Sequence, residues 1–416
     1  MMITTDVLII GAGPGGYRAA EYAAKQGLQV IIVEEDAVGG TCLNRGCIPT
    51  KTYVHSATFS EAFERQQQVV AQLRTGVEGI LAAPGITLLR GRATLLSPAT
   101  VATADTEVTA TRAIIIATGS SAKLLPLPDI GDPRVVTSTE LLQRSTLPRR
   151  LAIIGAGVIG MEFASVFQRF GSEVTVYEYM KECLPMLDGD IAKRLRKLME
   201  KRGVTFHMKT AVQSLADIDA DCILMATGRR PNTDGLNLKA AGIVLPSTGS
   251  PIPVDDNYRV IGQSAPIYAI GDVNGRQMLA HAAEMQAMRA VNHLMGRTDG
   301  IRFDVMPAAI FTQPEAACVG PTEERLKADG VPYQCHKAFW RANGKALAMG
   351  ESEGMLKLFT APADGVLIGC HAYGAHAADI VQEVSVLMCR NTTVQQLRDM
   401  VHIHPTLGEI LKTAAD

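Results

Sequence analysis

Two cysteines stand five positions apart in the segment GGTCLNRGCIPTK, residues 39–51. Cys42 and Cys47 could form a structural cross-link, supply half of a metal site, or act as a redox pair that opens and closes during turnover. A metal site needs further cysteine or histidine ligands at short spacing, and the adjoining sequence offers none. A static disulfide that closes so short a loop would add little stability. The segment therefore favours redox chemistry.

A disulfide between these two cysteines requires a bent backbone. In a regular helix, residues five apart point about 140° away from each other and are separated by about 7.5 Å of rise. The Cα atoms of a disulfide lie roughly 4.4–6.8 Å apart. Gly46 supplies the freedom for a bend, and a helix that begins there would direct N–H groups toward sulfur and favour the thiolate. We therefore expect a break in the chain between Cys42 and Cys47.

The overall composition sets broad limits on function. Lys+Arg number 40 and Asp+Glu 42 among 416 residues, and this balance predicts no nucleic-acid partner. No run approaches the roughly 18 apolar residues of a membrane helix. The first residues, MMITTDVLIIGAGPGG, lack a basic region and read as a β-strand rather than a signal peptide. We expect a cytoplasmic protein whose other six cysteines are mostly inert core residues.

An internal duplication organises the chain. The stretches DVLIIGAGPGGYRAAEYAAKQGLQVIIVEE and RLAIIGAGVIGMEFASVFQRFGSEVTVYEY align with a constant offset of 144 residues. Each predicts a strand, a G-x-G-x-x-G turn, a helix, and a second strand that ends in an acid. The glycines permit a tight turn close to a pyrophosphate, the helix N-terminus offers free N–H groups, and the acid accepts from ribose hydroxyls. The aligned residues are Gly11, Gly13, Gly16 and Glu34 in the first copy and Gly155, Gly157, Gly160 and Glu178 in the second.

Two complete copies favour two dinucleotide sites over two α/β domains that bind nothing. Each copy closes with an apolar strand that ends at a glycine, in IIIATGS (114–120) and in ILMATGRRPN (223–232). One resident and one exchanging dinucleotide suggest a flavin beside a nicotinamide. In APIYAIGDVNG, residues 265–275, Asp272 could hold the ribitol hydroxyls of a flavin or form an ordinary Asx turn.

A histidine and a glutamate near the C-terminus could act as a base and its orienting partner. His404 precedes Pro405, which favours an extended backbone, and Glu409 follows as the sequence enters a helix. In this arrangement the carboxylate holds one imidazole tautomer while the free nitrogen accepts a thiol proton. Such a pair can also be purely structural. We interpret the neighbouring His402 as having no chemical role.

The segment GGTCLNRGCIPTK resembles the redox-active segment of the flavin-dependent pyridine nucleotide–disulfide oxidoreductases, and it is close to that of their dihydrolipoamide dehydrogenase branch. The similarity runs from residue 6 to about 411 and includes both glycine turns, AIGD, MLAHAAE (278–284), FTQPEAACVG (311–320), NGKALAMGE (343–351) and VHIHPTLGEIL (401–411). It implies an α/β chain with two Rossmann-like FAD- and NAD(P)-binding domains and a C-terminal α+β dimerisation domain. It also implies an FAD enzyme that converts dihydrolipoamide and NAD+ to lipoamide, NADH and a proton.

The resemblance assigns roles residue by residue. Cys47 corresponds to the thiol nearest the flavin, and Cys42 corresponds to the interchange thiol that meets the substrate sulfur. Lys51 corresponds to a lysine near flavin N5 that pairs with a glutamate, here Glu162. Without the resemblance, Lys51 and Glu162 would be interpreted as solvated side chains. No metal is expected, and the other implied cofactor-binding residues are Gly40, Thr41, Thr118, Gly119, Gly228, Gly271, Met278, Leu279, Ala280 and His281.

The same resemblance implies partners and domain boundaries. His404 and Glu409 correspond to a pair that reaches into the active site of a partner subunit, which implies a homodimer. The implied second partner is a lipoyl-bearing protein, either the E2 of a 2-oxoacid dehydrogenase complex or the glycine-cleavage H protein. The expected domains are FAD-binding at 1–147, NAD-binding at 148–235, a second FAD-binding or central part at 236–304, and dimerisation at 305–416.

The chain is shorter than is usual for this family. From the first fingerprint glycine to the ATG glycine, the first copy spans 108 residues (119 minus 11) and the second spans 73 (228 minus 155). We therefore expect the antiparallel strands near 212–220 to be cut back, and the stretch near 60–70 is also abbreviated. These losses bear on recognition of a partner protein rather than on the redox centre. Arg45 and Thr50 replace commoner small or apolar residues of the cysteine loop.

Two other functions match part of the sequence. A reductase for glutathione, trypanothione-like or mercuric substrates would need basic residues after the second fingerprint strand or a C-terminal cysteine pair. Instead Tyr179 and Met180 follow that strand, and the tail reads ILKTAAD. Glu178 would repel a 2′-phosphate and favours NAD over NADP. A non-catalytic NAD-sensing subunit would not need both thiols together with His404 and Glu409.

Overall fold

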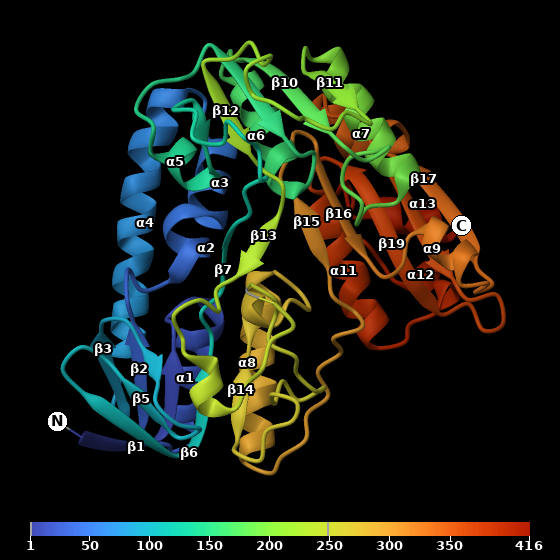
Figure 1. The fold of residues 1–416 in the computed structure, drawn as a ribbon. Coiled ribbons are helices and arrows are strands. Elements are labelled where there is room, and N and C mark those ends of the chain that lie inside the picture. Colours follow the sequence, from blue (N-terminus) through green and yellow to red (C-terminus); the bar gives the residue numbers. More distant parts are fainter. Residues whose placement is uncertain (1, 248) are drawn as a thin grey trace. The chain divides into compact units, whose positions relative to one another are not determined.

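The protein is described by a computed structural model that covers residues 2–247 and 249–416 (Figure 1). The chain forms two compact units, each assembled from separated segments. The first unit comprises the residues up to Tyr53, then Ser60–Lys123 and Gly228–Ile301. The second unit comprises Val54–Phe59, Leu124–Thr227 and Arg302–Asp416.

A parallel sheet forms the centre of the first unit. Its strands lie in the order β3-β2-β1-β6-β14, and β5 and β4 continue antiparallel from β6. Successive residues of β1 are completely buried, as expected for a strand that is covered on both faces. The strands are β1 (Met2–Ile10), β2 (Val30–Glu34), β3 (Ile86–Arg90), β4 (Thr94–Leu95), β5 (Thr100–Ala102), β6 (Glu107–Ile116) and β14 (Ile267–Ala269).

Helices and a short ribbon complete the first unit. Strands β7 (Ser120–Ala122) and β13 (Arg229–Pro231) pair antiparallel and form the ribbon seen in Figure 1. Helix α1 packs against α8 and against the first strands of the sheet. The helices are α1 (Pro14–Lys25), α2 (Gly40–Arg45), α3 (Cys47–Val54), α4 (Phe59–Leu81) and α8 (Ala280–Leu294), with 3-10 turns η1 (Leu238–Ala241) and η2 (Gly271–Asn274).

The second unit contains a second parallel sheet in the order β11-β10-β9-β12-β8. Its strands are β8 (Val135–Val136), β9 (Arg150–Ile154), β10 (Glu173–Glu178), β11 (Thr205–Met208) and β12 (Cys222–Met225), and its helices are α5 (Ser138–Gln143), α6 (Val158–Arg169) and α7 (Gly189–Lys201). The duplication predicted from the sequence is confirmed, since α6 follows β9 as α1 follows β1. The described residues 209–221 contain no strand, which confirms the expected loss.

The C-terminal part of the second unit is an antiparallel sheet in the order β15-β16-β19-β18-β17. Its strands are β15 (Ala308–Ile310), β16 (Glu315–Val319), β17 (Gln334–Phe339), β18 (Met355–Thr360) and β19 (Leu367–Gly374). The accompanying helices are α9 (Glu323–Ala328), α10 (Gly344–Met349), α11 (Ala377–Cys389), α12 (Val394–Asp399) and α13 (Glu409–Ala415), with η3 (Trp340–Ala342). The predicted fold class is therefore confirmed. The four domain boundaries stay a prediction, because the compact units do not separate the second parallel sheet from this one.

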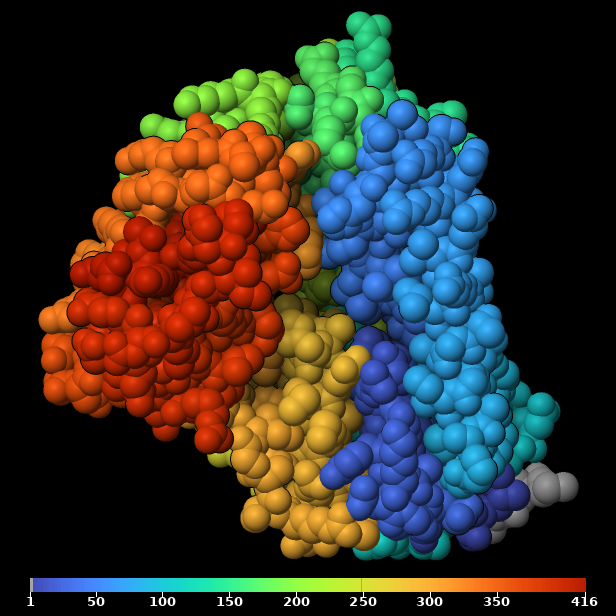
Figure 2. Space-filling view, turned by 180° about the vertical axis from the view of Figure 1, so that it is seen from behind, coloured from blue at the N-terminus to red at the C-terminus, as the bar shows by residue number. Residues whose placement is uncertain are grey.

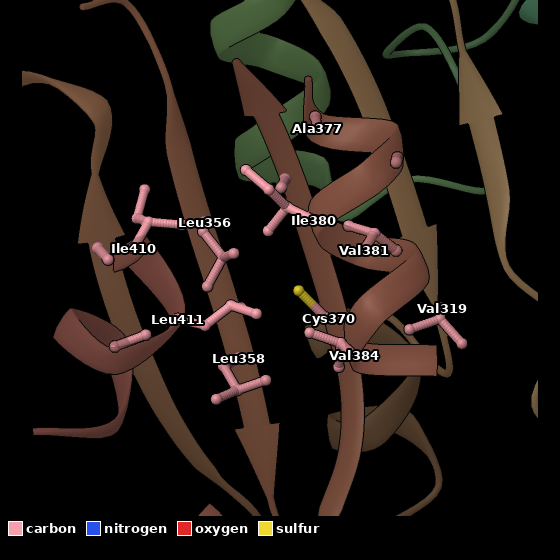
Figure 3. Packing of buried hydrophobic residues seen from close by; sticks show 14 of the residues in the cluster. Val319, Leu356, Leu358, Cys370, Ala377, Ile380, Val381, Val384, Ile410 and Leu411 are labelled. Atoms are coloured by element: carbon pink, nitrogen blue, oxygen red, sulfur yellow. The ribbon is translucent and has the colours of Figure 1, made fainter. Parts of the chain in front are cut away.

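An apolar core joins this sheet to its helices. Figure 3 shows Ile380, Val381 and Val384 of α11 lying over Cys370 of β19. On the other side of the view, Ile410 and Leu411 of α13 lie beside Leu356 and Leu358 of β18, and these four residues are likewise buried in this core. The core holds in place the short helix that begins at Glu409.

A buried ionic cluster lies at one edge of the same sheet. Lys357 of β18 is only 1 % exposed, and its Nζ donates to Asp188 Oδ1 at 2.7 Å and to Glu323 Oε2 at 2.5 Å. Burial by itself lowers the pKa of Lys357, but the hydrogen bonds to these two acids outweigh burial and raise that pKa. Glu323 also accepts from Lys327 and from Tyr333. Each buried charge is thus paired, as a stable interior requires.

We expect the free energy of unfolding to decrease as the pH falls from about 4.5 toward 2. The hydrogen bonds from Lys327 and Lys357 lower the pKa of Glu323 to about 2. In this pH window Glu323 is protonated in the unfolded chain but still ionised in the native protein. The stabilisation that is present at higher pH is therefore lost as the pH falls. Urea unfolding of wild type and of Glu323→Gln at about pH 5 and about pH 3 checks this. A stability difference between the two proteins that did not shrink on acidification would contradict it.

Candidate active site

The two cysteines lie on either side of a helix break. Helix α2 ends at Arg45, and α3 begins at Cys47 after Gly46. Both cysteines are present as thiols; Cys42 is half-buried and Cys47 is exposed. The Cys42 thiol is hydrogen-bonded to Cys47, so the break brings the two sulfur atoms together as the sequence predicted. A regular helix through this segment would have separated them.

The thiol of Cys42 has a strongly shifted pKa. The hydrogen bond to Cys47 and then burial raise the pKa of the Cys42 thiol well above its ordinary value, while Lys51 opposes the increase. A pKa above the ordinary value keeps the reduced Cys42 side chain protonated near neutral pH.

Asn44 holds the cysteine helix in place. Its Nδ2 donates to the carbonyl oxygens of Val38 and Gly40, each at 2.9 Å. Its Oδ1 accepts from Nε and Nη2 of Arg74, on α4, at 3.0 and 2.8 Å. Sequence reasoning missed Asn44 and Arg74, because their contact joins residues 30 positions apart and no motif marks it.

Arg45, which departs from the family pattern, makes an ion pair. Its Nη2 lies 2.6 Å from Asp36 Oδ2, and both side chains are substantially exposed. The pair links the end of α2 to the residues that follow β2. An exposed ion pair of this kind contributes little to stability, about 0–1 kcal/mol.

The first glycine turn leaves no room for side chains. Gly11 has φ 97°, and a Cβ on Gly16 would lie 1.8 Å from the Gly11 oxygen. A Cβ on Gly40 would lie 2.8 Å from the Cα of Gly13, so α2 begins against this turn. Helix α1 starts at Pro14, directly after the turn. The backbone therefore forms a close-approach cradle of the kind that accommodates a pyrophosphate at a helix N-terminus.

The acids at the ends of β2 and β10 have matching contacts. Glu34 Oε2 accepts from the Ala12 N–H at 2.6 Å, and Glu178 Oε2 accepts from the Ala156 N–H at 2.6 Å. The other oxygen of each acid accepts from the N–H two residues further on. Each carboxylate oxygen has a second lone pair, so hydroxyl groups of a ribose can still donate to it. In the second turn Gly155 has φ 105°, as Gly11 has in the first.

Asp272 lies in a polar cluster that the sequence reasoning did not anticipate. Ser120 Oγ donates to Asp272 Oδ2 at 2.5 Å, and Arg229 Nε donates to Ser120 Oγ at 2.7 Å. Burial lowers the pKa of Arg229, while Asp272 and Cys47 oppose that shift. The available signal was the position of Arg229, which directly follows the glycine of the second ATG segment.

The other cofactor-binding residues expected in the first unit lie at one edge of its parallel sheet. Thr118 Oγ1 donates to the Asn232 carbonyl at 2.7 Å, which joins the ATG loop to β13. Helix α8 begins at Ala280, so Met278 and Leu279 precede its N-terminus and His281 lies in its first turn. The parallel strands β1, β2, β6 and β14 all end at this edge, where open parallel α/β sheets bind ligands.

The buried polar groups at this edge also accommodate a cofactor. Gln286 Oε1 accepts from Gly271 N–H and from Asn274 Nδ2, both at 2.8 Å. Its Nε2 is buried and has no hydrogen-bond partner within the described part of the chain. A tight glycine cradle, an acid, a helix N-terminus and an unsatisfied buried amide together match the donor and acceptor pattern of a dinucleotide such as FAD.

The predicted histidine–glutamate pair forms at the start of α13. His404 Nδ1 lies 2.9 Å from Glu409 Oε1, and Glu409 Oε2 accepts from the Thr406 N–H at 2.9 Å. The backbone hydrogen bond and then the histidine lower the pKa of Glu409. The His404 side chain is 80 % exposed. The carboxylate therefore occupies one ring nitrogen and leaves Nε2 available for a substrate proton.

His402 and Glu162 also have defined contacts. His402 Nε2 lies 3.0 Å from Glu383 Oε1, which gives the chain a second histidine–glutamate pair. Glu162 is buried on α6, and its Oε1 accepts from the Phe311 N–H at 2.9 Å. Lys51 belongs to the first unit and Glu162 to the second, so their predicted pairing stays a prediction.

Among residues 2–247 and 249–416, no group of three or more His, Cys, Asp or Glu side chains is arranged to hold a metal ion. Over the same residues, no helix combines the length and the hydropathy of a membrane span.

The chain combines two dinucleotide-type glycine turns with a pair of thiols and a histidine–glutamate pair. This combination defines a dinucleotide-dependent disulfide oxidoreductase. Residues 5–287 match the family described as "Pyridine nucleotide-disulphide oxidoreductase", and residues 306–415 match the dimerisation domain of that family. The chain belongs to this family. Its members bind FAD and use a nicotinamide dinucleotide.

Several characterised proteins are similar to this chain over nearly its whole length. Leghemoglobin reductase of Glycine max is 34 % identical, with 99 % of this chain and 87 % of the relative covered. The mitochondrial dihydrolipoyl dehydrogenase of Pisum sativum is also 34 % identical, with 99 % and 90 % covered. Among solved structures, a Cu(II) complex of the HOCl-induced flavoprotein disulfide reductase RclA from Escherichia coli has a TM-score of 0.92 at 30 % identity, with 100 % and 99 % covered.

Proposed function

We propose that this protein oxidises dihydrolipoyl groups with NAD+ through a Cys42–Cys47 disulfide. The observation that carries the proposal is the hydrogen bond between the two thiols across the break between α2 and α3. The pair His404–Glu409 supports it, because a dithiol substrate must lose protons as it is oxidised. The mitochondrial dihydrolipoyl dehydrogenase of Pisum sativum, 34 % identical to this chain, lends further support.

The proposed roles of the side chains are those that the family resemblance implies. In the oxidised protein, a substrate thiolate attacks the Cys42 sulfur, and the Cys42–Cys47 bond breaks with Cys47 leaving as thiolate. The second substrate thiol then loses its proton to His404 and attacks its neighbour sulfur, so that the cyclic disulfide forms and Cys42 is released. The protein gains two electrons as a dithiol. Bound FAD supplies the two-electron chemistry between this dithiol and NAD+.

A homodimer is part of this proposal. Val401 is 99 % exposed and Ile403 is 79 % exposed, beside a histidine that is itself largely exposed. The C-terminal residues, red in Figure 2, lie at the surface of the molecule. Adjacent exposed apolar side chains favour burial against a partner, and this segment belongs to the family's dimerisation domain. We therefore place His404 in a site that the partner subunit completes.

Glu178→Ala is expected to narrow the preference for NAD over NADP by roughly tenfold in the ratio of kcat/KM values, or about 1.4 kcal/mol. The Glu178 carboxylate, held by the Ala156 and Met180 N–H groups, would accept from ribose hydroxyls and repel a 2′-phosphate. Steady-state kinetics with both coenzymes check this, with Glu173→Ala as a control on an exposed acid at the other end of β10. An unchanged ratio would place the selectivity elsewhere.

A substrate panel tests the proposed reaction. Purified FAD-loaded protein is assayed with dihydrolipoamide and NAD+, and then with oxidised glutathione, Hg(II) or Cu(II) together with NADH or NADPH. The proposal predicts that dihydrolipoamide with NAD+ is the preferred pair. Faster turnover of either metal ion, or of glutathione, would assign the protein to another branch of the family.

A further inference from the structure

The alanine between the first two glycines of each turn, Ala12 or Ala156, is hydrogen-bonded through both its N–H and its carbonyl. The N–H of Ala12 is bound by Glu34, and its carbonyl accepts from the Gly39 N–H at 2.8 Å. In the second turn, the carbonyl of Ala156 accepts from the Leu184 N–H at 3.0 Å. Both copies thus fold the segment that follows the acid back onto the turn. In the first copy that segment leads directly into the cysteine helix.

In the second copy the returning segment is the loop 179–188, which has no regular secondary structure. Cys183 and Leu184 are buried in it, while Tyr179 and Met180 are exposed. The Met186 carbonyl accepts from Cys318 Sγ at 3.7 Å. A loop of this length needs a fixed end if its middle is to hold the turn in one position.

Asp188, the last residue of this loop, supplies that end. It is completely buried and is held by residues of the C-terminal antiparallel sheet and by the start of α9. Its Oδ1 accepts from Lys357 Nζ at 2.7 Å, and its N–H donates to His371 Nδ1 at 3.0 Å. Its Oδ2 accepts from the Glu323 N–H at 3.1 Å.

These contacts form one continuous path within the second unit. The path leads from Lys357 to Asp188, along the loop to Leu184, and on to the carbonyl of Ala156. The other contacts of Asp188 are with α7, since Oδ1 also accepts from the Asp190 N–H and the Asp188 carbonyl accepts from the Ala192 N–H at 2.9 Å. A buried and fully paired ionic group adopts one geometry, because any other arrangement would leave a charge unpaired.

We propose that Lys357 and Asp188 are positioning residues for the nicotinamide coenzyme: the C-terminal sheet, through this ion pair, fixes the loop that holds the second glycine turn. The inference rests on the proposed assignment of that turn as the coenzyme site. Binding at such a turn depends on backbone N–H groups placed within a fraction of an ångström. Loosening the anchor therefore weakens coenzyme binding without touching the coenzyme.

The test uses the full-length, FAD-loaded protein and measures the dissociation constant for NADH. Lys357→Met and Asp188→Asn are each expected to raise it on the order of tenfold, with FAD retention unchanged. Hydrogen exchange at the amides of residues 179–188 should accelerate in the same variants. Lys327→Met is the matched control, because Lys327 is 63 % exposed and pairs with Glu323 rather than with Asp188. The dissociation constant for NADH of this control should stay within twofold of the wild-type value.

The outcomes separate this inference from the coenzyme assignment. If Lys357→Met does not fold, Asp188→Asn, which keeps the side-chain shape and Oδ1, carries the same comparison. A folded variant with unchanged NADH affinity would overturn the positioning role, and so would an equal effect of Lys327→Met. An equal loss of FAD would also overturn it, because it would indicate general destabilisation. If Glu178→Ala also left NADH affinity unchanged, the assignment of the second turn would be the part that fails.

Discussion

His404→Ala is expected to lower dihydrolipoamide turnover about 10²–10⁴-fold, the usual contribution of a general base. The same variant should keep NADH oxidation by artificial electron acceptors within a few-fold of wild type. The reason is that His404 Nε2 serves the substrate thiols, whereas artificial acceptors need no thiol deprotonation. Steady-state assays of both reactions on one protein preparation provide the measurement.

The chain offers a matched control for this experiment. His402 lies two residues away and has its own glutamate partner, Glu383, at 3.0 Å. His402→Ala should leave dihydrolipoamide turnover within a few-fold of wild type, because one ring nitrogen is taken by Glu383 and the side chain is largely buried. Equal losses of both activities in His404→Ala would contradict a role as thiol base.

Cys47→Ser is expected to abolish the long-wavelength absorbance that NADH generates in the wild-type protein, and to reduce dithiol turnover by on the order of 10⁴-fold or more. In the proposed mechanism Cys47 is the thiol nearest the flavin, and its thiolate gives rise to this absorbance. A serine hydroxyl supplies no polarisable thiolate. Anaerobic titration with NADH, followed by absorbance, measures the effect.

Cys42→Ser separates the two thiols. This variant should retain a long-wavelength band while losing dithiol turnover, because Cys47 remains but no disulfide can form. Cys389→Ser, at another exposed cysteine, should change neither property. A band that persisted in Cys47→Ser would assign it to another group.

The elements that carry the chemistry could be predicted because their determinants are local. The break between Cys42 and Cys47 follows from a glycine and from the distance a disulfide allows. The positions of Glu34 and Glu178 at the ends of β2 and β10, where each accepts from an N–H of its glycine turn, follow from a fixed spacing along one strand–turn–helix–strand unit. Because the two copies align with an offset of 144 residues, the elements of the second copy could be predicted from those of the first.

The contacts that could not be predicted join residues distant in the sequence. Arg74 reaches Asn44 across 30 positions, and Lys357 reaches Asp188 across 169. Neither pair has a periodicity or a motif, so only the packed sheet and helices bring the partners together. The ribbon of β7 and β13 likewise places Arg229 beside Ser120, although 109 positions separate them.

Differential alkylation of Cys42 and Cys47 measures directly whether they form a disulfide that NADH reduces. The aerobic, FAD-loaded protein is alkylated before and after anaerobic reduction by NADH, and the peptide that contains both cysteines is weighed by mass spectrometry. We expect that neither Cys42 nor Cys47 is alkylated before reduction and that both become reactive after it, while labelling of Cys389 stays the same. Identical labelling of Cys42 and Cys47 with and without NADH would contradict a disulfide that the nicotinamide coenzyme reduces.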